Sequence, residues 1–133
     1  MTWEAWDLKY KSNLDWNHAW GTAPGNVVRR KLMGIEPLTP GWGKARIRPC
    51  IGSLNDVEGK VPTIKGDVAF HAQQNDGSIH LHVTLPTNLP ATLELPINVS
   101  RTISIDGKPV RRQAIRDGYA LWELTPGNHD IVY

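Results

Sequence analysis

The chain has 133 residues, of which 40% are hydrophobic and 21% are charged, an ordinary balance for a single globular domain. Its formal net charge of +2 is too small to favour nucleic acid as a partner, and it has no apolar run of the roughly twenty residues that span a membrane. Because the N-terminus lacks a secretion-signal pattern, we expect a cytoplasmic protein. A single cysteine, Cys50, excludes an internal disulfide, and its apolar neighbours predict a buried or half-buried side chain.

The first twenty residues hold four of the six tryptophans, together with several acids and one histidine. Indole rings stack on the C–H faces of sugar rings, while carboxylates and imidazoles bind hydroxyl groups or move protons. This combination of residue types is typical of a site that processes saccharides.

Residues 17–33 are predicted to form a helix, because apolar side chains recur there at spacings of three, four and seven. Thr22 is a plausible N-cap with Pro24 in the first turn; alternatively, the helix begins near residue 17 and is kinked. Gly34 is expected at the C′ position, where a left-handed backbone ends the helix. Trp42 is expected to fill the junction that follows.

After residue 40 the pattern changes to short strands separated by turn residues. The clearest strand is Ser78–Leu85, whose strict alternation predicts one buried and one exposed face. Asn75-Asp76-Gly77 and Asp106-Gly107 predict hairpin turns. The predicted strands are 44–49, 57–62, 67–73, 78–85, 92–95, 101–105, 119–124 and 129–133. We therefore predict a mainly β fold, with a helical piece over residues 1–40 and an antiparallel β-sandwich over residues 41–133.

His80 and His82 have a spacing that places two imidazoles on the same face of one strand, as in some metal sites. His71, on the neighbouring predicted strand, is a candidate third ligand. The alternative, which we favour, is a polar outer face that binds no metal and no cofactor.

Arg46 and Arg48 alternate with apolar residues on another predicted strand. We expect these two side chains to lie on a solvated or interdomain face, paired with Glu36 or Asp56. Surface ion pairs of this kind contribute roughly 0–1 kcal/mol each.

Four blocks of sequence, in this order, resemble the C-terminal end of bacterial α-L-rhamnosidases (glycoside hydrolase family 78): Thr2–Trp6, Asn17–Gly21, Gly34–Trp42 and Ala45–Pro49. The resemblance covers most of the chain and is strongest over residues 2–50. It implies that residues 1–40 are a remnant of an (α/α)₆ catalytic barrel, including its last helix, and that the β-sandwich follows it. Enzymes of this family hydrolyse terminal α-L-rhamnosides with inversion.

The resemblance also implies roles for individual residues. Glu4 matches the general base of the family, His18 matches a histidine that contacts rhamnose hydroxyls, and Trp3 and Trp6 flank the base. Inversion needs a second carboxyl group that protonates the leaving oxygen, and in the family that acid lies upstream on barrel segments. We therefore expect no meaningful glycosidase activity from this chain alone.

Three functions are compatible with these observations: the C-terminal part of a rhamnosidase, a β-sandwich that binds carbohydrate without cleaving it, and a subunit that complements a separate barrel chain. The expected partners are a rhamnose-containing glycan in the parent enzyme and the barrel. Because an indole buries roughly 200 Å², tryptophans without a barrel are expected to fold back or pair with a second copy, which favours a homo-oligomer.

Overall fold

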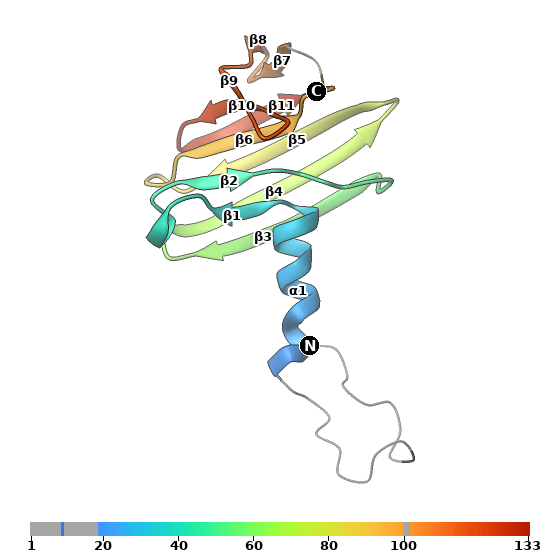
Figure 1. The fold of residues 1–133 in the computed structure, drawn as a ribbon, viewed down its shortest axis with the longest axis vertical. Helices are drawn as coiled ribbons and strands as arrows, with labels where there is room; N and C mark the ends of the chain where they lie inside the picture. The colour runs from blue at the N-terminus through green and yellow to red at the C-terminus, as the bar shows by residue number, and fades with distance from the viewer. Residues whose placement is uncertain (1–8, 10–18, 100–101) are drawn as a thin grey trace.

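Two β-sheets stacked face to face make up the body of the protein in the computed structural model, which describes residues 9, 19–99 and 102–133 (Figure 1). Sheet A has the order β1 (Ile35–Pro37), β2 (Ala45–Ile47), β6 (Ala91–Pro96), β10 (Tyr119–Leu124) and β9 (Ala114–Arg116). Sheet B has the order β3 (Asp56–Thr63), β4 (Gly66–Asn75), β5 (Ser78–Leu85), β11 (Gly127–Val132), β7 (Thr102–Ile105) and β8 (Lys108–Arg111). The predicted mainly β sandwich is confirmed.

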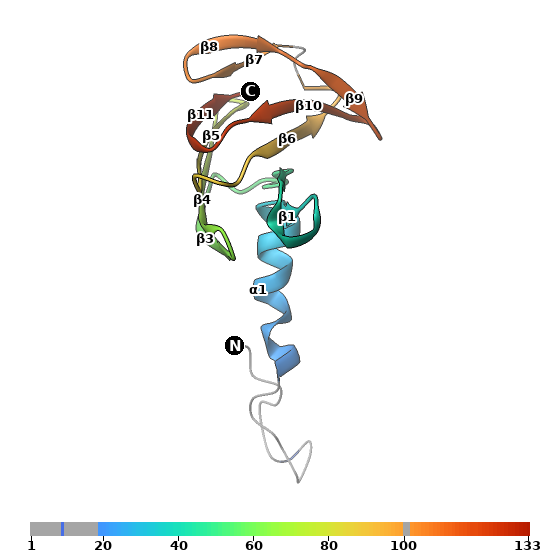
Figure 2. The ribbon, with the colours of Figure 1, turned by 90° about the vertical axis from the view of Figure 1, so that its left-hand side faces the viewer.

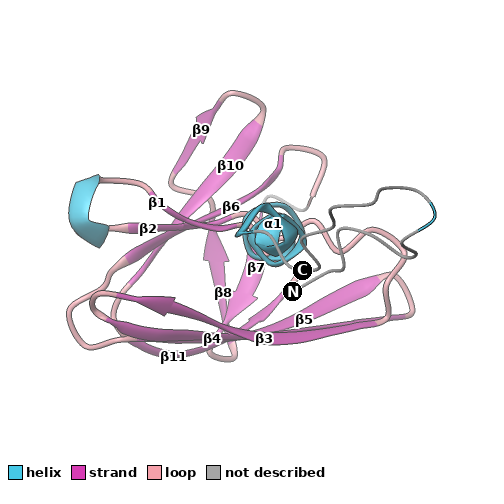
Figure 3. Cartoon of the chain, turned by 90° about the horizontal axis from the view of Figure 1, so that it is seen from below, coloured by secondary structure: helices cyan, strands magenta, loops and turns pink. Residues whose placement is uncertain are grey.

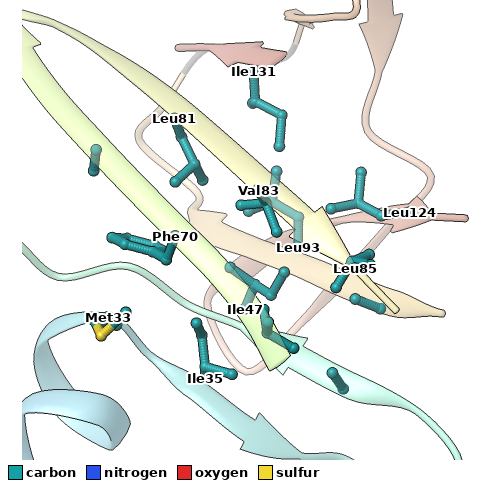
Figure 4. Packing of buried hydrophobic residues seen from close by; sticks show 14 of the residues in the cluster. Met33, Ile35, Ile47, Phe70, Leu81, Val83, Leu85, Leu93, Leu124 and Ile131 are labelled. Carbon is teal, nitrogen blue, oxygen red and sulfur yellow. The ribbon is translucent and has the colours of Figure 1, made fainter. Parts of the chain in front are cut away.

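The two sheets enclose one apolar core (Figure 4). Trp122 and Phe70 are the largest side chains buried within it, and the alternation predicted for β5 holds, with Leu81, Val83 and Leu85 inside. Trp42 packs partly buried against the same core, as expected for the junction. Strand pairing is antiparallel throughout the described sheets except between β2 and β6, which are parallel. Figure 3 shows β9 and β10 leaving the layered part of the sandwich.

Three of the two-residue hairpin loops are Asp-Gly pairs. Both residues have positive φ at Asp76-Gly77, at Asp106-Gly107 and at Asp117-Gly118, with φ between 49° and 81°. Positive φ at both central residues is the geometry of the two-residue hairpin turn that matches strand twist. The first two turns were predicted, whereas the third, which joins β9 to β10, was not.

A helical segment over residues 19–32 projects from the sandwich next to β1 (Figures 1 and 2). It comprises a 3₁₀ turn (Ala19–Thr22), α1 (Ala23–Val27) and a π-helical turn (Val28–Leu32). Val27 and Val28 remain 56% and 46% exposed, whereas Leu32, at the end of the segment, packs against the core. Gly34 ends the segment with φ +71°, as predicted.

Several local predictions need correction. Thr22 is itself helical, and its hydroxyl donates to the Ala19 carbonyl (2.6 Å), so it caps no backbone N–H. Cys50 is exposed, and its neighbour Ile51 enters the core in its place; the Cys50 backbone N–H donates to the Leu32 carbonyl (2.9 Å). The short strands β1, β8 and β9 were not predicted, since each has only three or four residues and exposed positions dominate in β8 and β9.

Candidate functional site

The residues for which the resemblance implies direct roles, Glu4, His18, Trp3 and Trp6, lie outside the described residues. Their roles as general base, sugar contact and flanking aromatics therefore remain predictions. The described part of the chain contains two polar features on opposite faces of the sandwich. One is a hollow on sheet B, and the other is a set of ion pairs on sheet A.

The hollow lies on the outer face of sheet B, where β4, β5 and β11 run side by side, and has a volume of about 180 Å³. We call it the imidazole hollow; its polar lining comprises His71, Gln73, His80, His82 and Asp130. His71 faces His82 across the β4–β5 pair, and His82 faces Asp130 across the β5–β11 pair. The register of the strands therefore places residues up to 59 positions apart in the sequence (71 to 130) on one surface.

A carboxylate orients each of two imidazoles in the imidazole hollow. His82 Nδ1 lies 2.7 Å from Asp130 Oδ1, and His71 Nε2 lies 3.2 Å from Asp56 Oδ2. The amide of Gln73 donates to the same Asp56 oxygen (2.9 Å), and this bond, with the one from His71, lowers the pKa of Asp56 below its ordinary value. An ionised carboxylate can only accept, so each imidazole presents its N–H to its aspartate. In the neutral ring, the other nitrogen is then left as an acceptor.

The arrangement suits a ligand rich in hydrogen-bond donors better than it suits a metal ion. The acceptors that remain for such a ligand include His71 Nδ1, His82 Nε2 and the side-chain carbonyl of Gln73. Among the residues that the structure describes, no three His, Cys, Asp or Glu side chains are placed to hold a metal ion. His80 and His82 share one face, as their spacing predicted, but His71 does not complete a metal site with them.

The outer face of sheet A carries two carboxylates, each paired with two arginines. Glu36 pairs with Arg30 and Arg46. Because β2 alternates, Ala45 and Ile47 enter the core while Arg46 turns outward, which places it beside Glu36 in register. The predicted Arg46–Glu36 pair is thus present, whereas Asp56 bonds to His71 and Gln73 instead.

Glu94 is the most deeply buried acid in the described part of the chain, with 1% exposure. Its Oε2 accepts from Arg48 Nε (2.8 Å) and also pairs with a terminal guanidinium nitrogen of Arg48, while Oε1 accepts from Arg116 (2.8 Å). The Arg48 guanidinium lies 3.9 Å from the centroid of the Tyr119 ring. Hydrogen bonds from two guanidinium groups, one of which also contacts the Tyr119 ring, offset the free-energy cost of burying this carboxylate.

We call these two triads together the charged face of sheet A: Arg30, Glu36, Arg46, Arg48, Glu94 and Arg116. Four arginines against two glutamates leave a formal surplus of two positive charges on this face. Sequence patterns could have placed Glu94 on the outer face, because it alternates with Leu93 and Leu95. Its partners, 46 and 22 residues away, could not be predicted locally.

The comparison with known families decides what kind of domain this is. Residues 34–108 match the family model described as the bacterial alpha-L-rhamnosidase C-terminal domain. The chain belongs to this family. The matched region begins at Gly34, covers β1 to β7 and ends at the first residue of β8.

Individual proteins agree with this assignment. The chain is 28% identical over 136 residues to an alpha-L-rhamnosidase of Alteromonas sp. (strain LOR), covering 92% of this chain and 15% of that protein. It is similar to the crystal structure of the Streptomyces avermitilis alpha-L-rhamnosidase complexed with L-rhamnose, with TM-score 0.76, 25% identity and coverage of 99% and 13%. An alpha-L-rhamnosidase from Dictyoglumus thermophilum shares the fold, with TM-score 0.74, 19% identity and coverage of 88% and 14%.

The C-terminal rhamnosidase domain therefore spans about one seventh of the length of these relatives. None of the helices in the described ranges is long and apolar enough to cross a membrane.

Proposed function

We propose that this chain acts as the C-terminal β-sandwich of a longer α-L-rhamnosidase and has no glycosidase activity by itself. The observation that carries the proposal is the family match over residues 34–108, together with relatives about seven times longer that are named alpha-L-rhamnosidases. In this proposal, Glu4 activates water for attack at the anomeric carbon of a terminal α-L-rhamnoside. The acid that protonates the leaving oxygen comes from the helical barrel, because inversion needs two separate carboxyl groups.

The exposed helical segment supports this arrangement. Val27 and Val28 are about half exposed, and none of the side chains described within α1 or the π-helical turn is buried. A short helix gains most of its stability from packing an apolar face, so this segment is expected to pack against the barrel. The positive surplus on the charged face of sheet A fits an acidic surface on the same partner.

A reconstitution experiment tests the proposal. The isolated chain is expected to release no 4-nitrophenol from 4-nitrophenyl α-L-rhamnoside, and activity should appear when a polypeptide with the α-helical catalytic region of a relative is joined to it. Glu4→Gln should then lower kcat by about 10²–10⁴-fold, the range for a lost general base. Glu58→Gln, which changes an exposed acid on β3 in the same way, should leave kcat unchanged. Hydrolysis by the isolated chain at an ordinary enzymatic rate would overturn the proposal.

The same experiment separates a covalent domain from a complementing subunit. Activity on mixing two separate polypeptides would identify a subunit that docks onto a barrel chain. Activity only in the joined polypeptide would identify a domain.

A carbohydrate-binding module is the second candidate function, and the imidazole hollow is the observation that favours it. Its hydrogen-bond acceptors match the hydroxyl groups of a sugar. Isothermal titration of the isolated chain with L-rhamnose should then show binding that His71→Ala and His82→Ala abolish. Lys65→Ala, at an exposed position in the β3–β4 turn, is the control. If Trp3→Ala or Trp6→Ala abolishes binding instead, the sugar binds at the N-terminal tryptophans.

Two further expectations from the sequence, the homo-oligomer and the cytoplasmic location, belong to this proposal as well. Sedimentation velocity of the isolated chain tests the first, and fractionation of cells that express the natural gene product tests the second.

A further inference from the structure

The β7–β8 hairpin covers one end of the core, above β10 and β11 (Figure 2). Beneath it, Trp122 is fully buried, and its indole N–H donates to the carbonyl of Val110 on β8 (3.2 Å). The ladder that joins this hairpin to sheet B has just two residue pairs, Ile105 with Ile131 and Ser104 with Val132. Because this ladder is so short, other contacts must contribute to holding the β7–β8 hairpin against sheet B.

Asp106, in the turn of this hairpin, makes three contacts with β11. Its backbone N–H donates to the Asp130 carbonyl (2.7 Å), and its Oδ1 accepts from the Asp130 N–H (2.8 Å). Its Oδ2 lies 3.1 Å from Nδ1 of His129. The backbone N–H and the carboxylate of one residue therefore hold the turn of the hairpin against β11.

His129 is the buried half of this connection, with 7% exposure. Its second ring nitrogen, Nε2, lies 2.7 Å from the backbone carbonyl of Thr125. A carbonyl oxygen can only accept a hydrogen bond, and so can an ionised carboxylate. Both contacts are hydrogen bonds at the same time only if both ring nitrogens carry a proton, which is the imidazolium form.

We propose that His129 and Asp106 form a pH-sensitive clasp that fastens the β7–β8 hairpin over Trp122. The clasp is closed when His129 is an imidazolium and Asp106 a carboxylate. When His129 loses a proton, one of its two nitrogens faces an acceptor without a hydrogen, and a buried bond is lost. The hairpin then opens more often.

The surroundings of the clasp contain few other charges that could replace these groups. Lys108, on β8, lies near enough to Asp106 to favour its ionised form. Asp130, although adjacent in sequence, directs its carboxylate to His82 on the outer face of sheet B. From β5, the residue opposite His129 in register is Val83, which is apolar.

On the acid side, the bond from the Asp130 N–H, with that from His129, lowers the pKa of Asp106 below its ordinary value of 3.8. A depressed pKa stabilises the fold above the unfolded-state value, and this contribution is lost as pH falls through the folded-state pKa. The clasp therefore opens at both ends of the pH range. At the acid end Asp106 becomes protonated, and at the alkaline end His129 loses its proton.

Hydrogen exchange of the full chain, followed by NMR between about pH 5 and pH 9, tests the clasp. After correction for the intrinsic rate, the opening constant of the Trp122 indole N–H and of the β7–β8 amides should rise about tenfold or more as His129 deprotonates. In His129→Gln the opening constant should be raised at low pH and independent of pH. His82→Gln removes an exposed histidine that pairs with an aspartate, and should behave as the wild type.

The ring ¹⁵N shifts of His129 provide a second readout that needs no variant. At the acid end of this range, both nitrogens should show the shifts of protonated nitrogens, because each faces an acceptor. The proposal is overturned if one ring nitrogen is already unprotonated at pH 5, or if the opening constant depends on pH in the same way in the wild type and in His129→Gln.

Discussion

Gly34 lies directly against the backbone of Arg48, so closely that a Cβ atom at Gly34 would be 1.8 Å from the Arg48 carbonyl oxygen. The Arg48 N–H donates to the Gly34 carbonyl (3.0 Å), and the helical segment ends at this contact. The junction between helix and sandwich therefore requires glycine for two reasons, its positive φ and the absence of a side chain.

Gly34→Ala is expected to destabilise the domain by at least about 2 kcal/mol, because the left-handed backbone and the close contact both oppose a side chain. Thermal or urea unfolding of the isolated chain measures the effect. Gly52→Ala is the matched control, since Gly52 has φ +60° but a Cβ atom added there would meet nothing within 4 Å. Equal losses in the two variants would show that the contact with Arg48 contributes nothing.

Replacing the buried carboxylate of the charged face should also be costly. Glu94→Ala leaves Arg48 and Arg116 without their shared partner, and we expect a loss of about 2–3 kcal/mol in the free energy of unfolding. This value lies below that for fully buried pairs because both arginines reach solvent.

Lys44→Met is the control for Glu94→Ala. Lys44 pairs with Glu123, whose side chain is half exposed, so its removal should cost less than about 1 kcal/mol. A loss from Glu94→Ala as small as that from Lys44→Met would contradict a special role for the buried acid.

Tyr133 should make the domain less stable in alkali. Burial raises the pKa of its phenol above the ordinary value of 10.0, and the neighbouring Cys50 adds to the shift when ionised. A raised pKa gives stability that is fully present below the unfolded-state value, about pH 10, and is lost as pH rises through the folded-state pKa. Urea unfolding at pH 8 and above pH 10 should show this loss in the wild type and a smaller loss in Tyr133→Phe. In Tyr119→Phe, the free energy of unfolding should fall with pH as much as it does in the wild type.

The exposed valines of the helical segment should promote self-association of the isolated chain. Val27→Gln together with Val28→Gln removes the two largest exposed apolar side chains described in the segment, so the association constant from sedimentation should fall several-fold. Ile64→Gln changes an even more exposed residue in the β3–β4 turn and should have little effect. A chain that is monomeric before any substitution would rule out this source of association.

Local patterns predicted much of the sandwich. The alternation over 78–85 correctly identified which side chains of β5 enter the core, and the sequence predicted two of the three hairpins that turn at an Asp-Gly pair. The pair Asp117-Gly118 carries the same signal and would have revealed β9. These features were predictable because backbone φ preferences and the period of two depend on neighbouring residues.

Local sequence patterns could not predict partners that lie far apart in the sequence. Nothing near Glu94 indicates that Arg48 and Arg116 bond to it, and nothing near His129 indicates Asp106. The parallel pairing of β2 with β6 joins residues 46 positions apart, as Ala45 with Ala91. Such contacts depend on how whole strands stack, which is determined by burial summed over both sheets.

By itself, the sequence determined the family, the mainly β fold, the faces of the regular strands and the glycine at the end of the helix. Only the tertiary structure decided that Cys50 is exposed, that Val27 and Val28 of the helical segment are not covered by the sandwich, and that the imidazole hollow and the clasp exist. The physical reason is that turn geometry and alternation are properties of adjacent residues, whereas a site is made by side chains that only folding brings together.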